Sequence, residues 1–312
     1  MSRFYGKFAA VVLSSSLCGV AFANTLSVDP AVEKQQEKQF IQQMVTQDHF
    51  SRWKLTRLFN GLTEDTKIIQ SMNAPFEKQP WGFYRNFFLT PERVTLGAQY
   101  MKTHYRVLHE MSQKYGIPPS IITAIIGVET EYGNHLGKYS VLRSLYTLGF
   151  YYPPREKFFR KELGQYLILT RDNGLNPTTI KGSYAGALGI PQFMPSSYRY
   201  YGVALEKNAP VNLFNNNDAI ASVANYFHKM GWVPNQPIAY LLRSAHQPLN
   251  EGASRLMLQL PKGPQYWETF KNFKVIMTYN HNVVYAMAVY QLSQQIEKQY
   301  AENAKNNRQA NS

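Results

Sequence analysis

One stretch of the chain decides how it folds, Ile121-Ile-Thr-Ala-Ile-Ile-Gly-Val-Glu-Thr-Glu-Tyr-Gly133. Its first eight residues are almost all apolar, which predicts a buried helix. On a helical wheel with about 100° per residue, Ile122 and Ile125 lie within about 40° of Glu129, so the Glu129 carboxyl group sits in the middle of the apolar face. Glu131 lies about 200° from Glu129, on the opposite face, where we expect a solvated charge.

A carboxyl group on a buried helix face has two explanations. Burial without a partner is costly, and desolvation raises the pKa of a carboxyl group. An acid that stays protonated near neutral pH can protonate the oxygen of a leaving group, so Glu129 is a candidate general acid. Alternatively, Glu129 forms a structural ion pair with a Lys or Arg from elsewhere in the chain. The wheel alone does not choose between these two roles.

The rest of the chain is predicted to be mainly helical with a small β portion. Thr90-Pro91-Glu92 is typical of a helix start, and residues 153–170 and 217–230 are also predicted to be helical. The stretch 172–197 is rich in Gly, Ser and Pro and is long enough to indicate a functional loop. Residues 232–275 contain Pro and short alternating pieces, which predict a strand-containing insert.

The first residues indicate export. A positively charged start, the apolar stretch Phe8–Val20 and the small residues Ala21 and Ala23 predict a secretory signal peptide over residues 1–23. A retained membrane anchor is the alternative. The single cysteine, Cys18, lies inside this segment and follows a leucine where lipoprotein signals have a small residue. We therefore expect a mature protein with no disulfide, no lipid anchor and no transmembrane segment.

The amino-acid composition limits the classes of binding partner that we expect. The chain of 312 residues has a formal charge of +13, an isoelectric point near 9.6 and 14% aromatic residues. This balance points to an anionic or electron-rich partner such as nucleic acid, a membrane surface or a cell-wall polymer. Export and the lack of a recognisable nucleic-acid module argue against nucleic acid. The seven histidines show no metal-binding spacing, so we expect no metal ligands among them.

Seven stretches carry a family signature, and they follow one another in the family's order and spacing. They are Gly127–Gly133, Val141–Leu148, Lys181–Gly189, Pro191–Tyr198, Asp218–Phe227, Met277–His281 and Tyr285–Tyr290. Between about residue 80 and residue 295 the chain thus resembles the membrane-bound lytic transglycosylase B family. The resemblance implies a mainly α (α+β) fold, with a lysozyme-like helical core, an extra helical N-terminal region and a small antiparallel β insert.

The resemblance also implies a division of the chain. The expected parts are a signal peptide over 1–23, a helical N-terminal region over 24–115, a lysozyme-like catalytic core over 116–231, a small β-containing subdomain over 232–275, a helix closing the core over 276–300 and a disordered tail over 301–312.

The implied activity is cleavage of the β-1,4 bond between N-acetylmuramic acid (MurNAc) and N-acetylglucosamine (GlcNAc) in peptidoglycan, with formation of 1,6-anhydroMurNAc ends. Glu129 matches the family's single catalytic residue, acting first as acid and then as base on the muramoyl 6-hydroxyl. This would explain why no second carboxylate is evident, since a hydrolytic glycosidase needs one. The alternative is a non-catalytic peptidoglycan-binding scaffold on the same fold. Either protein is expected to be a periplasmic monomer that contacts glycan strands and, in the second case, cell-wall synthesis proteins.

The resemblance implies nine substrate-binding residues, which are Tyr84, Arg155, Ser183, Gln192, Phe193, Tyr226, Tyr279, Asn280 and Tyr285. The polar members would hydrogen-bond the sugars, the aromatic members would line the cleft, and the arginine would meet peptide-stem carboxylates. A second family arginine is replaced here by Pro154. Without the resemblance, the aromatic residues would be interpreted as core and the others as turn and packing residues.

One departure from the family concerns calcium. Related enzymes carry an EF-hand-like calcium loop, and the equivalent stretch here is Ala204–Asn215, leading to Asp218. Ala204 replaces the leading oxygen ligand, and Lys207 and Pro210 are poor loop residues. Calcium needs 6–8 oxygen ligands, so we expect no calcium site and no cofactor, with Asp218 acting as a helix cap.

Overall fold

The computed structural model describes residues 30–74 and 79–310, and the predicted signal peptide with Cys18 lies outside these ranges. Within them the chain is mainly helical and carries two small antiparallel sheets, which confirms the predicted mixture of helices and a small β portion. Of the helices in these ranges, none combines the length and the apolar character needed to cross a membrane.

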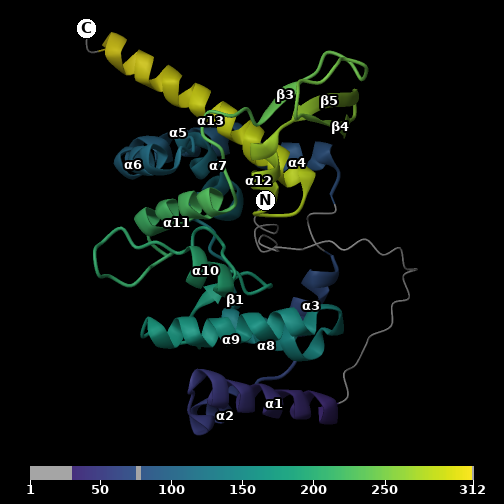
Figure 1. The fold of residues 1–312 in the computed structure, drawn as a ribbon, viewed down its shortest axis with the longest axis vertical. Coiled ribbons are helices and arrows are strands. Elements are labelled where there is room, and N and C mark those ends of the chain that lie inside the picture. Colours follow the sequence, from purple (N-terminus) through teal and green to yellow (C-terminus); the bar gives the residue numbers. More distant parts are fainter. Residues whose placement is uncertain (1–29, 75–78, 311–312) are drawn as a thin grey trace.

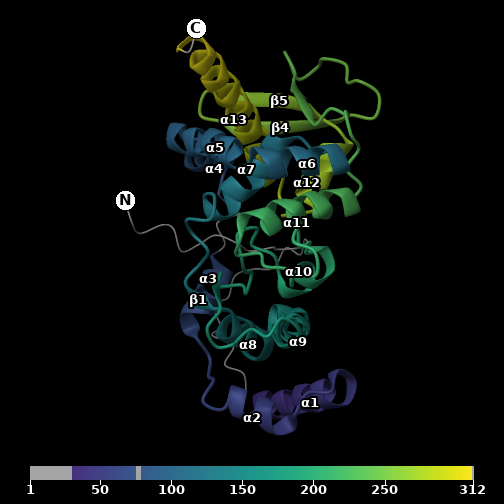
Figure 2. The ribbon, with the colours of Figure 1, turned by 90° about the vertical axis from the view of Figure 1, so that its left-hand side faces the viewer.

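The helices stack in layers along the long axis of the molecule (Figures 1 and 2). One end holds α1 (Pro30–Asp48), α2 (Arg52–Phe59), α3 (Thr66–Asn73), α8 (Val141–Tyr151), a 3-10 turn (Pro153–Arg155) and α9 (Glu156–Asp172). Above them lie α10 (Pro195–Tyr201) and α11 (Asn216–Lys229). The other end holds α4 (Trp81–Phe88), α5 (Pro91–Thr103), α6 (Tyr105–Tyr115), α7 (Pro119–Thr130), α12 (Lys271–Met277) and α13 (Val283–Ala310).

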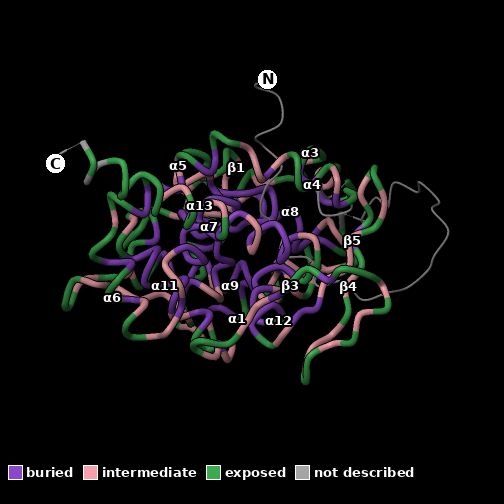
Figure 3. The backbone as a smooth tube through the Cα atoms, turned by 90° about the horizontal axis from the view of Figure 1, so that it is seen from above, coloured by how far each residue is buried: buried purple, intermediate pink, exposed green. Residues whose placement is uncertain are grey.

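Helix α7 lies at the centre of the core. Every residue from Ser120 to Val128 is buried, and α7 packs against α5, α6, α11 and α13. Seen from above, the buried positions are concentrated around α7 and its neighbours (Figure 3). The apolar run of the sequence therefore forms a helix that is enclosed on all sides, with only its last turn reaching the surface of a cleft.

The two sheets have different roles. Strands β3 (Ala239–Leu241), β4 (Ser254–Leu260) and β5 (Gly263–Thr269) form a sheet of order β3-β5-β4 inside the stretch where strands are predicted. Strands β1 (Tyr139–Ser140) and β2 (Lys181–Gly182) pair with each other over two residues. This second pairing ties the segment after α7 to the loop that carries Ser183.

Two predicted boundaries are corrected by the structure. The predicted N-terminal region is divided, because α1 and α3 pack on α8 whereas α4 and α5 pack on α13. The predicted disordered tail over 301–312 is helical as far as Ala310, because α13 continues to that residue. In this helix Lys298 and Glu302, four residues apart, form an ion pair at 4.0 Å. Pairs at this spacing stabilise a helix, whereas the Asn- and Lys-rich composition of the segment favoured a prediction of disorder.

Candidate functional site

Glu129 lies in the last turn of α7, at the point where the chain reverses. The helix ends at Thr130, and the next three residues have positive φ angles of 50° at Glu131, 62° at Tyr132 and 92° at Gly133. Thr130 anchors this turn by donating a hydrogen bond from Oγ1 to the Ile190 carbonyl oxygen at 2.8 Å. The Glu129 side chain is thereby kept at the partly exposed end of an otherwise buried helix.

The packing of the Tyr132 phenol stabilises the left-handed backbone at Glu131 and at Tyr132 itself. Its phenol donates a hydrogen bond to the Arg93 carbonyl oxygen at 2.7 Å. The phenol occupies the space left by two glycines, since a Cβ at Gly97 or Gly127 would lie 2.5 or 2.6 Å from the Tyr132 oxygen. Left-handed backbone at a non-glycine residue is costly, so this packing between α5 and α7 sets the position of the turn after Glu129.

Two buried tyrosines lie on the side of the Glu129 carboxyl group that faces α13. Tyr285 of α13 donates a hydrogen bond to Glu129 Oε1 at 2.6 Å, and Tyr279 stacks on Tyr285 with ring centroids 6.5 Å apart. Burial, and after it the charge of Glu129, raises the pKa of both phenols well above the ordinary value of tyrosine. Both therefore stay protonated at neutral pH, and Tyr285 remains a hydrogen-bond donor to the carboxylate.

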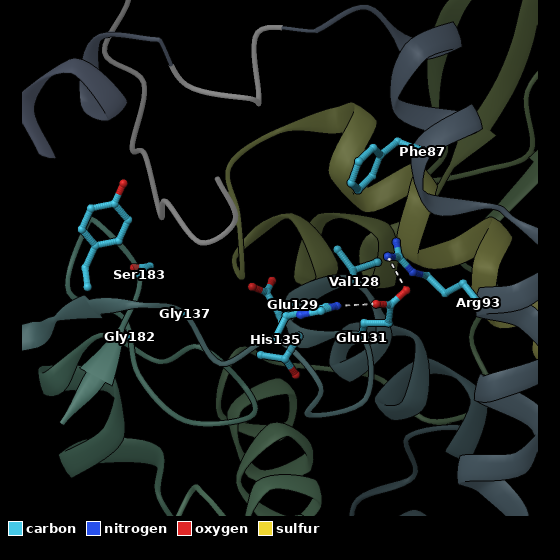
Figure 4. A pocket seen from close by; sticks show the side chains of 11 residues that line it. Phe87, Arg93, Val128, Glu129, Glu131, His135, Gly137, Gly182 and Ser183 are labelled. Carbon is cyan, nitrogen blue, oxygen red and sulfur yellow. Dashed lines mark hydrogen bonds and ion pairs between the residues drawn. The ribbon is translucent and has the colours of Figure 1, made fainter. Parts of the chain in front are cut away.

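A cavity opens beside Glu129 and is lined by residues from α5, α7, the following turn and both short strands (Figure 4). The lining residues are Phe87, Arg93, Val128, Glu129, Thr130, Glu131, His135, Gly137, Tyr139, Gly182 and Ser183. Ser183 is buried, and its Oγ accepts a hydrogen bond from the Ala187 backbone N–H at 3.0 Å. The cavity thus brings together Glu129 and Ser183, two of the residues singled out from the sequence.

Four more of the residues singled out from the sequence line a second cavity. It is lined by Gln192, Phe193, Met194, Ser197, Tyr226, Thr278 and Tyr279. Gln192 adopts a positive φ of 49°, and its Nε2 donates hydrogen bonds to the carbonyl oxygens of Gly189 at 2.7 Å and Leu136 at 3.2 Å. Its Oε1 is buried and has no hydrogen-bond partner among the described residues.

The three other predicted site residues lie outside both cavities. Tyr84 is buried, and it contributes to raising the pKa of Tyr285. Asn280 is buried in the connection between α12 and α13, directly after Tyr279. Arg155 ends the 3-10 turn, and its guanidinium lies over the Phe158 ring at 4.4 Å. Tyr84 and Asn280 are thus close to the environment of Glu129, whereas Arg155 belongs to a separate part of the surface.

The expectation that Glu131 is a solvated charge is wrong. Its side chain is only 14% exposed and contacts Arg93 Nη2 at 3.2 Å and His135 Nε2 at 2.8 Å. The helical wheel does not apply to Glu131 because the helix ends one residue earlier. Figure 4 shows the carboxyl groups of Glu129 and Glu131 pointing to different sides, toward Ser183 and Arg93 respectively.

Comparison with known proteins identifies the family. The model described as the transglycosylase SLT domain matches residues 33–255 and 241–294. Membrane-bound lytic murein transglycosylase B of Escherichia coli (strain K12) is 37% identical over 295 residues, covering 83% of this chain and 82% of that protein. The chain belongs to the SLT family of lytic murein transglycosylases. It is an enzyme of the lyase class that acts on peptidoglycan.

Two solved structures show the fold that this lytic transglycosylase shares. Lytic transglycosylase Slt35 of Escherichia coli, in complex with calcium, has a TM-score of 0.79 and 36% identity, over 85% of this chain and 93% of that chain. SltB3 of Pseudomonas aeruginosa, in complex with NAG-NAM-pentapeptide, has a TM-score of 0.76 and 27% identity, over 85% of this chain and 79% of that chain. These similarities confirm the predicted lysozyme-like fold class.

The loop that would bind calcium is organised here by a side chain of the protein. Asp218 Oδ1 accepts a hydrogen bond from the Leu205 N–H at 3.0 Å, and Oδ2 accepts one from the Asn212 N–H at 2.8 Å. The expectation that Asp218 caps α11 is wrong, because Asn215 is the N-cap and accepts from the Asp218 N–H at 2.8 Å. Backbone N–H groups of the loop thus donate to both oxygens of Asp218 and connect the loop to α11.

Substitution of Tyr285 tests how its hydrogen bond affects the pKa of the Glu129 carboxyl group. In Tyr285→Phe the carboxylate loses a donor that favours its charged form, so its pKa should rise. The high-pH limb of the activity profile, where a general acid loses its proton, should then move up by about one pH unit. Tyr290→Phe is the matched control, because Tyr290 is on the same helix and donates to the Ala239 carbonyl oxygen. A pH profile that moves equally in both variants would contradict this tuning.

A change at Glu131 tests the buried ion pair. The Arg93 side chain is 6% exposed, and Glu131→Gln leaves its charge uncompensated, so the free energy of unfolding should fall by about 2 kcal/mol. Urea denaturation measures this loss. Glu302→Gln breaks an exposed pair on α13 and should change the stability by less than about 0.5 kcal/mol. Equal stability of the two variants would show that Glu131 behaves as a solvated charge.

Proposed function

We propose that this lytic transglycosylase cleaves the bond between MurNAc and GlcNAc and leaves a 1,6-anhydroMurNAc end. The Glu129 carboxylic acid donates its proton to the glycosidic oxygen as the bond from that oxygen to C1 of MurNAc breaks, which releases the GlcNAc 4-hydroxyl. The Glu129 carboxylate then accepts the proton of the MurNAc 6-hydroxyl as that oxygen bonds to C1, with assistance from the N-acetyl group. The acid is regenerated, and no water is consumed.

The observation that carries this proposal is the environment of Glu129. The carboxyl group ends a buried helix, faces a cavity and accepts a hydrogen bond from a neutral phenol of Tyr285. Burial favours the neutral acid and the Tyr285 donor favours the carboxylate, so the environment suits a group that takes both forms in one reaction.

The second carboxylate of the cavity is badly placed for hydrolysis. Of the residues that line this cavity, Glu131 is the carboxylate other than Glu129. Hydrogen bonds from Arg93 and His135 occupy Glu131 Oε1 and Oε2 respectively, so Glu131 cannot readily activate a water molecule. This supports attack by the substrate's own hydroxyl group, since an inverting or retaining hydrolase needs a second free carboxylate.

The predicted substrate-binding residues fit a glycan. The buried Gln192 Oε1 can accept a hydrogen bond from a sugar N–H or hydroxyl group. Phe193, Tyr226 and Tyr279 supply apolar ring faces around it. SltB3 was solved with NAG-NAM-pentapeptide and with NAG-anhNAM-pentapeptide, ligands that correspond to a substrate and an anhydro product. Arg155 would meet the peptide stem.

The proposed place of action is the periplasm. Residues 1–23 have the pattern of an export signal, and the formal charge of +13 suits a cell-wall polymer that carries carboxylates. We propose that the enzyme acts there as a monomer without a lipid on Cys18, and that cell-wall synthesis proteins are possible partners.

Analysis of the products by mass spectrometry tests the reaction. The enzyme without residues 1–23 should release anhydromuropeptides from purified peptidoglycan, and Glu129→Gln should lower the rate by about 10²–10⁴-fold. Glu302→Gln is the control for a surface carboxylate and should keep full activity. Products with reducing ends would show a hydrolase. Binding without any product from the unchanged enzyme would show a scaffold protein.

We further propose that the loop from Ala204 to Asn215 is stable without calcium. Excess calcium or a chelator should leave the melting temperature unchanged, and purified enzyme should contain no stoichiometric calcium by elemental analysis. Asp218→Ala removes two charge-assisted hydrogen bonds and should cost about 3 kcal/mol of stability. Glu251→Ala, at an exposed position, should have little effect. Retained calcium, or a melting temperature that rises with calcium, would contradict the proposal.

A further inference from the structure

A continuous line of aromatic rings leads from Glu129 to the outside of the molecule. Tyr285, which donates to Glu129, stacks on Tyr279. The Tyr279 ring lies 5.0 Å from Tyr226, Tyr226 lies 4.8 Å from Tyr201, and Tyr201 lies 4.7 Å from Tyr200, all between ring centroids. The line ends at Tyr200, which is 74% exposed. Buried rings at one end are thus connected to a solvated ring at the other.

The exposed end of this line borders a hollow lined by residues of α9 and α10, two helices that lie side by side (Figures 1 and 2). The hollow is lined by Tyr200 and Tyr201 and by the polar side chains of Lys161, Gln165, Ser197 and Arg199. Ser197 also lines the cavity that contains Gln192, Tyr226 and Tyr279. Ser197 therefore lies between the hollow and this second cavity.

The polar groups of the hollow are held in place. Arg199 donates to Gln165 Oε1 and lies 3.9 Å from Asp172. Next to Ser197, Ser196 donates from Oγ and N–H to the buried Glu162 carboxylate at 2.6 and 2.9 Å. These contacts connect α10 to α9 and fix the position of the exposed Tyr200 relative to the cleft. A preorganised ring bordered by hydroxyl, amide and cationic donors is suited to a sugar, whose apolar face stacks while its hydroxyl and acetyl oxygens accept hydrogen bonds.

We infer that Tyr200, Tyr201 and the side chains around them form an outer subsite that binds the same glycan strand at a distance from the bond being cleaved. A single exposed tyrosine is ordinary on a protein surface. Here ring contacts link Tyr200 to Tyr226 and Tyr279 in the second cavity, and the hollow shares Ser197 with that cavity. The other side chains around Tyr200 are polar. The inference rests on the proposed function only in requiring that a glycan strand occupies the cleft beside Glu129.

Substrate length tests the subsite. Tyr200→Ala should lower kcat/KM on long glycan strands by about tenfold, the loss expected for one stacked ring. It should leave kcat/KM unchanged on a short oligosaccharide that occupies only the cleft beside Glu129. Tyr200→Phe should retain activity on long strands, since the ring is kept. Tyr105→Ala is the control, because Tyr105 is 56% exposed and lies on α6.

A binding measurement separates this inference from the catalytic proposal. In the Glu129→Gln background, additional Tyr200→Ala should weaken binding to long strands by about tenfold, whatever product the active enzyme makes. Equal losses on short and long substrates would overturn the inference, because Tyr200 would then act on the cleft itself. Unchanged binding of long strands would also overturn it. Thermal unfolding of each variant shows whether the fold is intact.

Discussion

The structure depends on the burial of α7 together with the abrupt end of this helix at Thr130. An enclosed apolar helix is stabilised by the hydrophobic effect over its whole length, but a carboxylate in its middle would be destabilising. Glu129 is tolerated because the left-handed turn at Glu131 and Tyr132 stops the helix directly after it. The packing that supports this turn involves α5, α7 and α13, so the position of Glu129 depends on elements far apart in the sequence.

The sequence was sufficient to single out Glu129 as the candidate acid, because the helical wheel places it among isoleucines and the family signature surrounds it. Glu131 could not be placed in the same way, since a wheel assumes a helix that continues and the sequence marks its end only weakly, by Tyr132 and Gly133. Its partner Arg93 lies 38 residues earlier, and no local pattern connects them.

The error over the helix cap also comes from a contact outside the local helix pattern. Asp218 is a reasonable helix cap by sequence, but its carboxylate is used by backbone N–H groups of the preceding loop. Arg155 and Gln192 both match the family, yet the fold brings only Gln192 into a cavity with Tyr279. The family signature thus predicted the fold, whereas the grouping of the residues that it singles out depends on packing between layers.

The two carboxylates of the cleft have opposite requirements. In the proposed reaction Glu129 both gives and takes a proton, so it must not be held in either form: burial favours the protonated form, and donation by Tyr285 favours the ionised form. An uncompensated Arg93 in the same cavity would favour the ionised form further and would disable the acid. By pairing with Arg93, Glu131 compensates this cation. The balance at Glu129 therefore requires that the neighbouring carboxylate stay charged and paired.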